Sequence, residues 1–311
     1  MTRTRLNKMS RTPTGLRIAG VACAAALLLA SCGDSANTSA ASVNGVAVNQ
    51  QTLEVTLTQL SEAGQIELQG GVIPMDATRS VLVAMIRGEA TTQILAKFKI
   101  NITDEDTQTV IDQVSQDAGY DTLGEELKQL IIGLNSGDLA LSRVKAPTAA
   151  EIETMYNEAP VSLGAVCAQH ILVEEEATAR EVIDLLNDGG NFKELAGEYS
   201  TEPNAAETGG ILGSVDGDCI LLTDYQSQFD AAFTAGALGA KVGVPTGPVK
   251  SSFGYHVILI RPFDDIKASL QFLLSKTPGE MLMTGYLATT PVDVASQYGR
   301  WDTATGRIVD L

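Results

Sequence analysis

The stretch Phe253-Gly254-Tyr255-His256-Val257-Ile258-Leu259-Ile260 has the aromatic and β-branched composition of a buried strand. A second run of this kind is Gln169-His170-Ile171-Leu172-Val173. Each run contains one histidine, and these are the only 2 histidines among the 311 residues. A single histidine in an apolar strand is usually a satisfied core residue. Because both histidines occur in this setting, we predict that one sheet brings His170 and His256 together.

Several motifs lie between these two runs. In chain order they are Gly189-Gly190-Asn191-Phe192-Lys193-Glu194-Leu195-Ala196, Tyr199-Ser200-Thr201-Glu202-Pro203, Gly209-Gly210-Ile211-Leu212-Gly213, Gln228-Phe229-Asp230-Ala231-Ala232-Phe233 and Gly247-Pro248-Val249. In this order, and ending in Phe-Gly-Tyr-His, the series closely resembles the parvulin family of peptidyl-prolyl cis/trans isomerases. The resemblance covers residues 162–263. It implies a domain with a small antiparallel sheet flanked by helices that isomerises X-Pro bonds.

The resemblance also implies which side chains form the site. His170 and His256 would face each other at its floor, and Glu202 stands where the family has aspartate or cysteine. These three residues are the expected catalytic group. The residues expected to bind the substrate are Leu212, Tyr225 and Phe229, which would form the proline pocket, and Ser251, which would lie near the histidines.

Three positions depart from the family pattern. Glu202 is one methylene longer than aspartate, Ile211 replaces an acidic residue, and Tyr225 stands where methionine is commonest. These departures leave open an alternative, in which the isomerase fold serves only for binding. Because Phe229 is retained and the pocket stays apolar, we expect the domain to be active.

The chemistry itself needs neither a nucleophile nor a metal. Rotation about an X-Pro bond must break the amide resonance, a barrier of roughly 18–20 kcal/mol. A protein lowers this barrier when it binds the twisted amide more tightly than the planar one. Apolar groups around the proline ring and polar groups beside the carbonyl can do this, so we expect no cofactor.

The segment after the first histidine run is acidic. It reads Glu174-Glu175-Glu176, and Arg180 is the only nearby cation. Some parvulins recognise phosphoserine before proline with a basic loop at this place. Three carboxylates would repel a phosphate. We therefore do not expect phosphorylated substrates.

The beginning of the chain has the features of a secretion signal. Residues 1–31 carry five basic residues and no acidic ones, and Ile18–Ala30 form an apolar run of 13 residues. This length suits a signal peptide and is too short to span a membrane. The run ends in Leu29-Ala30-Ser31-Cys32, which resembles a bacterial lipobox with Cys32 as the lipid acceptor. The alternative is an ordinary secretory signal. We predict an exported protein that is anchored by lipid to the extracytoplasmic face of a bacterial membrane.

Removal of residues 1–31 would leave a strongly acidic chain. The remaining 280 residues keep 16 basic residues against 38 acidic ones, a formal charge of −22. Nucleic acid would be repelled, so it is not an expected partner. The expected partners are unfolded or extended exported polypeptides that contain X-Pro, and the membrane only through the lipid anchor.

The rest of the mature chain divides by composition. Residues 32–42 are rich in glycine, serine and alanine and are predicted to form a flexible tether. The dipeptide Asn44-Gly45 between apolar residues predicts a tight hairpin. Apolar periodicity then predicts four helices within residues 43–147, beginning near Asn49, Asp76, Thr103 and Asp121.

A connector helix is predicted within residues 148–161, because Thr148 and Glu151 have the spacing of a capping box. The order of hairpin, helices, connector and parvulin domain resembles the SurA-like and PrsA-like exported foldases, whose helical lobe cradles unfolded clients. In such foldases a C-terminal segment returns to that lobe. We expect the same of residues 264–311, which contain the single tryptophan, Trp301. The alternative is a loose tail.

Two cysteines remain, Cys167 and Cys219. The spacing Cys167-x-x-His170 could suggest zinc. Residues three apart on a strand point to opposite faces, however, so we expect no metal. Outside the cytoplasm a Cys167–Cys219 disulfide is the natural state, and two buried free thiols are the alternative.

Together these features predict an α+β chain with a helical SurA-like chaperone lobe and a parvulin domain. The predicted function is that of a lipid-anchored foldase, which isomerises X-Pro bonds in exported proteins. The rival hypothesis is a non-enzymatic holdase or assembly scaffold that uses the same cleft only to bind extended chains.

Overall fold

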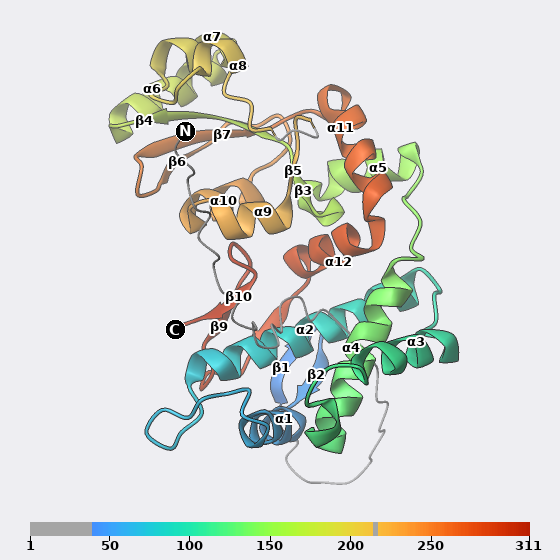
Figure 1. The fold of residues 1–311 in the computed structure, drawn as a ribbon. Coiled ribbons are helices and arrows are strands. Elements are labelled where there is room, and N and C mark those ends of the chain that lie inside the picture. Colours follow the sequence, from blue (N-terminus) through green and yellow to red (C-terminus); the bar gives the residue numbers. More distant parts are fainter. Residues whose placement is uncertain (1–38, 214–216) are drawn as a thin grey trace, which may run out of the picture.

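A computed structural model describes residues 39–213 and 217–311. The predicted signal 1–31 and the lipid acceptor Cys32 lie outside the described residues. The described chain is α+β, as predicted, with a lower lobe of helices around a small sheet and an upper domain built on a second sheet (Figure 1). None of the described helices is both long and apolar enough to cross a membrane.

The lower lobe begins with a hairpin of β1 (Ser39–Val43) and β2 (Val46–Asn49). Asn44 and Gly45 form the turn with φ angles of 48° and 77°. Two adjacent residues with positive φ are typical of the tight turn that Asn-Gly predicts, so this prediction is confirmed. Residues 39–42, however, were expected in the flexible tether and instead lie in β1. They are ordered because β1 pairs with a strand on each side.

Four helices follow the hairpin. They are α1 (Gln50–Glu62), α2 (Met75–Lys97), α3 (Asp104–Val114) and α4 (Glu125–Leu141). Side chains cap the first and the third as predicted, because Asn49 accepts the N–H of Thr52 and Thr103 accepts that of Asp106. The fourth was expected to begin at Asp121. It begins four residues later because Tyr120–Thr122 first form a separate turn of 3-10 helix.

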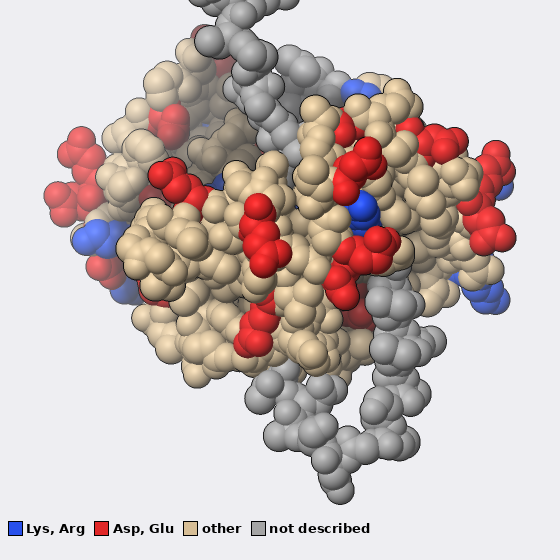
Figure 2. All heavy atoms as spheres, turned by 60° about the horizontal axis from the view of Figure 1, so that its bottom comes forward, with Lys and Arg blue, Asp and Glu red and all other residues tan. Residues whose placement is uncertain are grey.

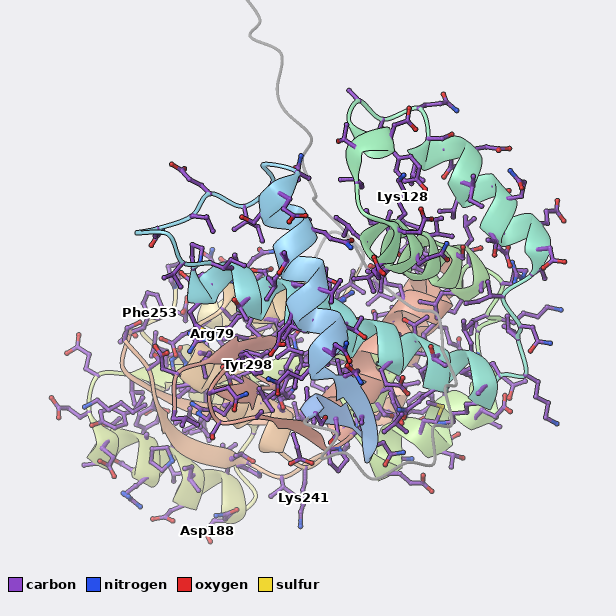
Figure 3. The ribbon with its side chains drawn as sticks, turned by 90° about the horizontal axis from the view of Figure 1, so that it is seen from below. Arg79, Lys128, Asp188, Lys241, Phe253 and Tyr298 are labelled. Atoms are coloured by element: carbon purple, nitrogen blue, oxygen red, sulfur yellow. A yellow bond between two sulfur atoms is a disulfide. The ribbon has the colours of Figure 1, made fainter. Side chains whose placement is uncertain are left out.

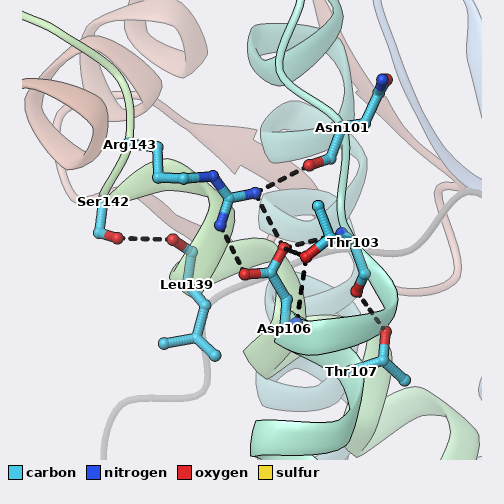
Figure 4. Close-up of polar contacts among 7 residues, drawn as sticks. All are labelled: Asn101, Thr103, Asp106, Thr107, Leu139, Ser142 and Arg143. Carbon is cyan, nitrogen blue, oxygen red and sulfur yellow. Dashed lines mark hydrogen bonds and ion pairs between the residues drawn. The ribbon is translucent and has the colours of Figure 1, made fainter.

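An ion pair between buried Asp106 and partly exposed Arg143 ties α3 to the end of α4 (Figure 4). Asp106 is only 7% exposed, and both of its carboxylate oxygens accept hydrogen bonds from Arg143. Arg143 also donates to the carbonyl of Asn101 at 2.8 Å. The hydrogen bonds from Arg143, together with those from Thr103, lower the pKa of Asp106 to about 2 against the burial that raises it. The carboxylate is therefore ionised at neutral pH.

The connector helix is α5 (Ala149–Glu158), and its predicted capping box is present. Thr148 accepts the N–H of Glu151, whose carboxylate accepts the N–H of Thr148. The helix is joined to the upper domain by Tyr156, which is fully buried. Its hydroxyl donates to the carbonyl of Arg261 at 2.8 Å.

The upper domain is built on an antiparallel sheet in the order β4-β7-β6. Its strands are β4 (Ala168–Val173), β6 (Thr246–Lys250) and β7 (Tyr255–Ile260). A short ladder of β3 (Ala165–Val166) and β5 (Ile220–Leu221) lies beside it. In Figure 1 one face carries α6 (Glu176–Asn187), α7 (Phe192–Tyr199) and α8 (Ala205–Thr208). The other face carries α9 (Leu222–Gln228) and α10 (Ala231–Gly239).

The C-terminal segment returns to the lower lobe. After α11 (Phe263–Lys276) and α12 (Pro278–Thr289), strand β8 (Val292–Val294) pairs with β1. The last hairpin, β9 (Arg300–Asp302) with β10 (Arg307–Val309), lies against α2. There Arg79 donates to the carbonyl of Tyr298 at 2.7 Å (Figure 3). The first strand of the described chain, β1, thus shares a sheet with β8 from the C-terminal segment.

The surface of the lower lobe is acidic. Figure 2 shows aspartate and glutamate side chains spread over this face, with few lysines and arginines between them. This distribution agrees with the formal net charge of −17 for the whole chain.

Candidate isomerase site

The two histidines meet on one face of the upper sheet. Strands β4 and β7 pair as predicted, with Leu172 opposite His256 and Ile258 opposite His170. Because residues two apart on a strand share a face, this register places both imidazoles on the same side. Their Nδ1 atoms lie 3.2 Å apart. At this distance one ring donates a hydrogen bond and the other accepts it, so each ring determines the tautomer of the other.

Both imidazoles are buried and neutral at neutral pH. Burial and, to a smaller extent, the nearby His256 together lower the pKa of His170 to about 4. Burial also lowers the pKa of His256, while the carboxylate of Asp230 opposes this effect. The pair can therefore offer hydrogen bonds to a ligand, but it is a poor proton donor.

Ser251 extends the polar chain from the pair. Its hydroxyl oxygen lies 2.7 Å from Nε2 of His256 and accepts the backbone N–H of Phe253 at 3.0 Å. The resulting chain runs from the turn between β6 and β7 through Ser251 and His256 to His170. His256 therefore contacts both of the other predicted residues, Ser251 and His170.

An aromatic cluster closes the site from the side of α9 and α10. The ring of Phe229 is half-buried and stacks on Tyr225, with centroids 4.3 Å apart. Tyr225, which was expected to line the proline pocket, is fully buried, so Phe229 is the more exposed of the two rings. Tyr225 lies in the core because α9 packs against the β3–β5 ladder. Its ring supports Phe229 from behind.

Leu212 lies beside the first histidine strand. Its N–H donates to the carbonyl of Ala168, while the N–H of His170 donates to the carbonyl of Gly210. The chain approaches β4 so closely here that a Cβ at Gly210 would lie 2.2 Å from the carbonyl oxygen of His170. Only glycine fits, which explains the Gly-Gly of this motif.

Glu202 is less closely connected to the histidines than expected. The preceding residues bracket Leu172, since Ser200 accepts its N–H and Thr201 donates to its carbonyl. This places Glu202 next to the histidine strand. Within the described part of the chain, however, its carboxylate makes no hydrogen bond to either imidazole.

The cysteines lie next to strands β4 and β5. Cys167 and Cys219 form a disulfide that joins the start of β4 to the segment before β5. Both are buried. Residues 39–213 and 217–311 contain no group of three or more histidine, cysteine or acidic side chains placed to hold a metal ion.

Comparison with known proteins places this geometry in a family. Residues 171–261 match the family described as "Rotamase: PPIC-type PPIASE domain". The foldase protein PrsA of Halalkalibacterium halodurans is 30% identical over 270 residues, which cover 82% of this chain and 75% of that protein. The chain belongs to the PrsA foldase family. It therefore carries a PPIC-type peptidyl-prolyl isomerase domain, and the predicted resemblance to parvulins is confirmed.

Other PrsA foldases match over different lengths of the chain. The PrsA foldase of Clostridium kluyveri is 45% identical over 89 residues, 29% of this chain and 24% of its own length. The solved structure of PrsA from Bacillus subtilis is 23% identical over 82% of this chain and 91% of that chain, with a TM-score of 0.29.

Three residues that sequence analysis left without a role lie at this PrsA-family site. The buried ring of Phe233 has its centroid 5.3 Å from that of His170 and 4.8 Å from that of His256. Asp230 accepts hydrogen bonds from Ser252. Phe253, which follows Ser252 in the chain, is 72% exposed. All three belong to motifs quoted from the sequence, but their contacts depend on how α10 and the β6–β7 turn pack.

Proposed function

We propose that this PrsA-family protein catalyses cis/trans isomerisation of X-Pro bonds in unfolded or extended exported polypeptides. The observation that carries the proposal is the neutral, buried pair of His170 and His256 against the ring of Phe233, which in turn stacks on Phe229. A polar group beside an apolar wall is what a twisted prolyl amide requires. No cofactor takes part in the proposed reaction.

The proposed mechanism is selective binding of the twisted amide. Phe229 and Leu212 would hold the proline ring while the histidine side of the site accommodates the rotating carbonyl. Each ~1.4 kcal/mol of binding gained only in the twisted state accelerates rotation tenfold. His170, His256 and Ser251 would act by orientation, because the lowered pKa of His170 makes proton donation unfavourable. Glu202 is proposed to act through its charge at the edge of the site.

We further propose a division of labour along the chain. Residues 162–263 would form the isomerase domain, linked through 148–161 to a chaperone lobe of residues 43–147. The C-terminal segment 264–311 would complete that lobe, which the pairing of β8 with β1 supports. The acidic segment Glu174-Glu175-Glu176 argues against phosphorylated substrates.

The experiment that tests the isomerase uses a protein whose refolding is limited by proline isomerisation. Wild-type chain should accelerate this refolding, and Phe229→Ala should reduce the acceleration roughly tenfold. Truncation of an enclosed phenylalanine typically costs about 3–5 kcal/mol. The expected loss is smaller because Phe229 is only half-buried. If wild-type chain does not accelerate refolding but still prevents aggregation of clients, the holdase hypothesis replaces the enzyme.

The lipid anchor is a separate proposal. We propose that residues 1–31 are removed and that Cys32 is lipidated, which would hold the protein on the extracytoplasmic face of the membrane. Cys32→Ala should abolish lipid attachment and leave the chain unprocessed or released. Membrane partitioning and processing identical to wild type would contradict the anchor.

A further inference from the structure

The carboxylate of Asp230 joins the two elements that surround the histidines. One oxygen caps α10, since it accepts the N–H groups of Ala232 at 2.9 Å and Phe233 at 3.3 Å. The other oxygen accepts the N–H of Ser252 at 3.3 Å and its hydroxyl at 3.0 Å. A helix cap needs only the first pair of bonds. The second pair reaches across to the turn between β6 and β7.

Both ends of this link lead to the imidazoles. Helix α10 carries Phe233, whose ring contacts both histidines. The β6–β7 turn carries Ser251, which bonds Nε2 of His256 at 2.7 Å. The turn is closed by the bond from the N–H of Ser251 to the carbonyl of Gly254. A shift of α10 relative to this turn would therefore disturb the aromatic and the polar support of His256 together.

We propose that Asp230 is a positioning residue of the isomerase site: by holding the β6–β7 turn on the N-terminus of α10, it keeps Ser251 on His256 and Phe233 against both imidazoles. The inference rests on the proposed function, because the consequence of the link is the orientation of the histidine pair. Asp230 itself does not touch the proposed substrate.

The charge of Asp230 has a second effect on the same ring. Burial would raise its pKa, but the bonds from Ser252, Phe233 and Ala232 together hold the pKa below its usual range. The carboxylate is therefore ionised. Burial lowers the pKa of His256, and the charge of Asp230 opposes this effect. The imidazole of His256 also contacts a second titratable side chain, His170. Loss of the charge should lower the pKa of His256.

The upper domain contains a matched control for the capping role. Asn191 caps α7 with the same geometry, since its side chain accepts the N–H of Lys193 at 2.9 Å and of Glu194 at 3.3 Å. This cap lies on the opposite face of the sheet and has no bond to the β6–β7 turn. Asn191→Ala removes a helix cap alone. Asp230→Ser keeps the helix cap and removes the link to the β6–β7 turn, because serine is a good cap but too short to reach Ser252.

The test uses full-length chain labelled with 15N in histidine. With only 2 histidines in the chain, each ring nitrogen can be assigned by NMR from single-histidine variants. Asp230→Ser should lower the pKa of His256, shift its Nε2 resonance and reduce kcat/KM for a prolyl peptide by roughly tenfold. Asn191→Ala should leave the ring resonances and the rate as in wild type. Ser252→Ala, which removes one bond and no cap, should shift the same resonance less.

The outcomes separate the two levels of the proposal. Unchanged His256 resonances in folded Asp230→Ser and Ser252→Ala would overturn the positioning role, as would changed resonances with an unchanged rate. An equal loss of rate in Asn191→Ala would also overturn it, since the effect would then be one of stability. If wild-type chain has no isomerase activity, the proposed function fails, while the ring spectra still decide whether Asp230 orients His256.

Discussion

Two polar pairs that contain buried side chains, one in each part of the molecule, differ in how their charges are balanced. In the lower lobe, Asp106 meets Arg143 and every oxygen of the carboxylate is hydrogen-bonded. In the upper domain, His170 meets His256, and two bases share one hydrogen bond. The first pair joins opposite charges. The second pair is compatible with burial only when both rings are neutral.

The pKa shifts express this difference. The bonds from Arg143 lower the pKa of Asp106 to about 2 and favour its charged form. Burial lowers the pKa of His170 to about 4 and favours its neutral form. A matched ion pair of this kind holds two helices together. An unmatched pair of bases contributes little to stability, and its place next to an apolar ring suits ligand binding.

The largest expected difference between the two pairs is their effect on isomerase activity. His170→Ala should reduce acceleration of a proline-limited refolding reaction by roughly tenfold or more, through lost orientation of His256. Arg143→Ala, the matched loss of one partner in the other pair, should leave that activity unchanged. Refolding kinetics at equal concentrations of folded protein measure both. Equal activity losses in the two variants would show that the pairs do not differ in function.

The contributions of the two pairs to the free energy of unfolding should change in different pH ranges. Between pH 6.5 and pH 4 the unfolded chain binds a proton on His170 that the folded chain does not, so stability falls as the pH falls through this window. At about 1.4 kcal/mol per pH unit, the loss should reach about 3 kcal/mol at pH 4. Urea unfolding at several pH values measures it.

The acid–base pair should respond only at lower pH. The contribution of Asp106 is fully present above its ordinary pKa of 3.8 and is lost as the pH falls toward 2. The control is His170→Ala, in which the slope between pH 6.5 and pH 4 should be smaller. An unchanged slope in this variant would contradict the assignment to His170.

Arg143→Ala should have a smaller effect on stability. Removal of one partner from a fully buried pair costs about 3–5 kcal/mol. The side chain of Arg143 is 41% exposed, so water can replace part of its bonds and we expect about 1–2 kcal/mol. Thermal or urea unfolding at pH 7 measures this loss. A wild-type free energy of unfolding in the variant would mean that the pair does not stabilise α3 on α4.

The smallest expected effect concerns the two cysteines, of which Cys167 immediately precedes the strand of His170. Native chain without reductant should show no labelling of Cys167 or Cys219 by a thiol reagent, and mass spectrometry should find their peptides linked. Since Cys167 immediately precedes β4, the disulfide would restrain the histidine strand and leave the Asp106 pair unaffected. Quantitative labelling of both thiols without denaturant would contradict this expectation.

Local patterns in the sequence determined much of this protein. Asn44-Gly45 predicted the hairpin, Thr103 and Thr148 predicted helix starts, and the apolar runs around His170 and His256 predicted two strands that pair. These features depend on neighbours within a few residues, or on a motif order specific enough to reveal the family. The same motifs predicted Phe229 and Ser251 as site residues, and the structure places Ser251 on His256 and Phe229 against Phe233.

Only the tertiary structure decided the contacts between distant segments. Whether residues 39–42 form a tether or a strand depends on β8, which lies at the other end of the chain. The resemblance to parvulins predicted Tyr225 as a pocket residue, and the packing of α9 buries this side chain completely. The second pair of bonds to Asp230 exists because α10 and the β6–β7 turn meet in space. No periodicity encodes such contacts, since they arise from how whole elements pack against one another.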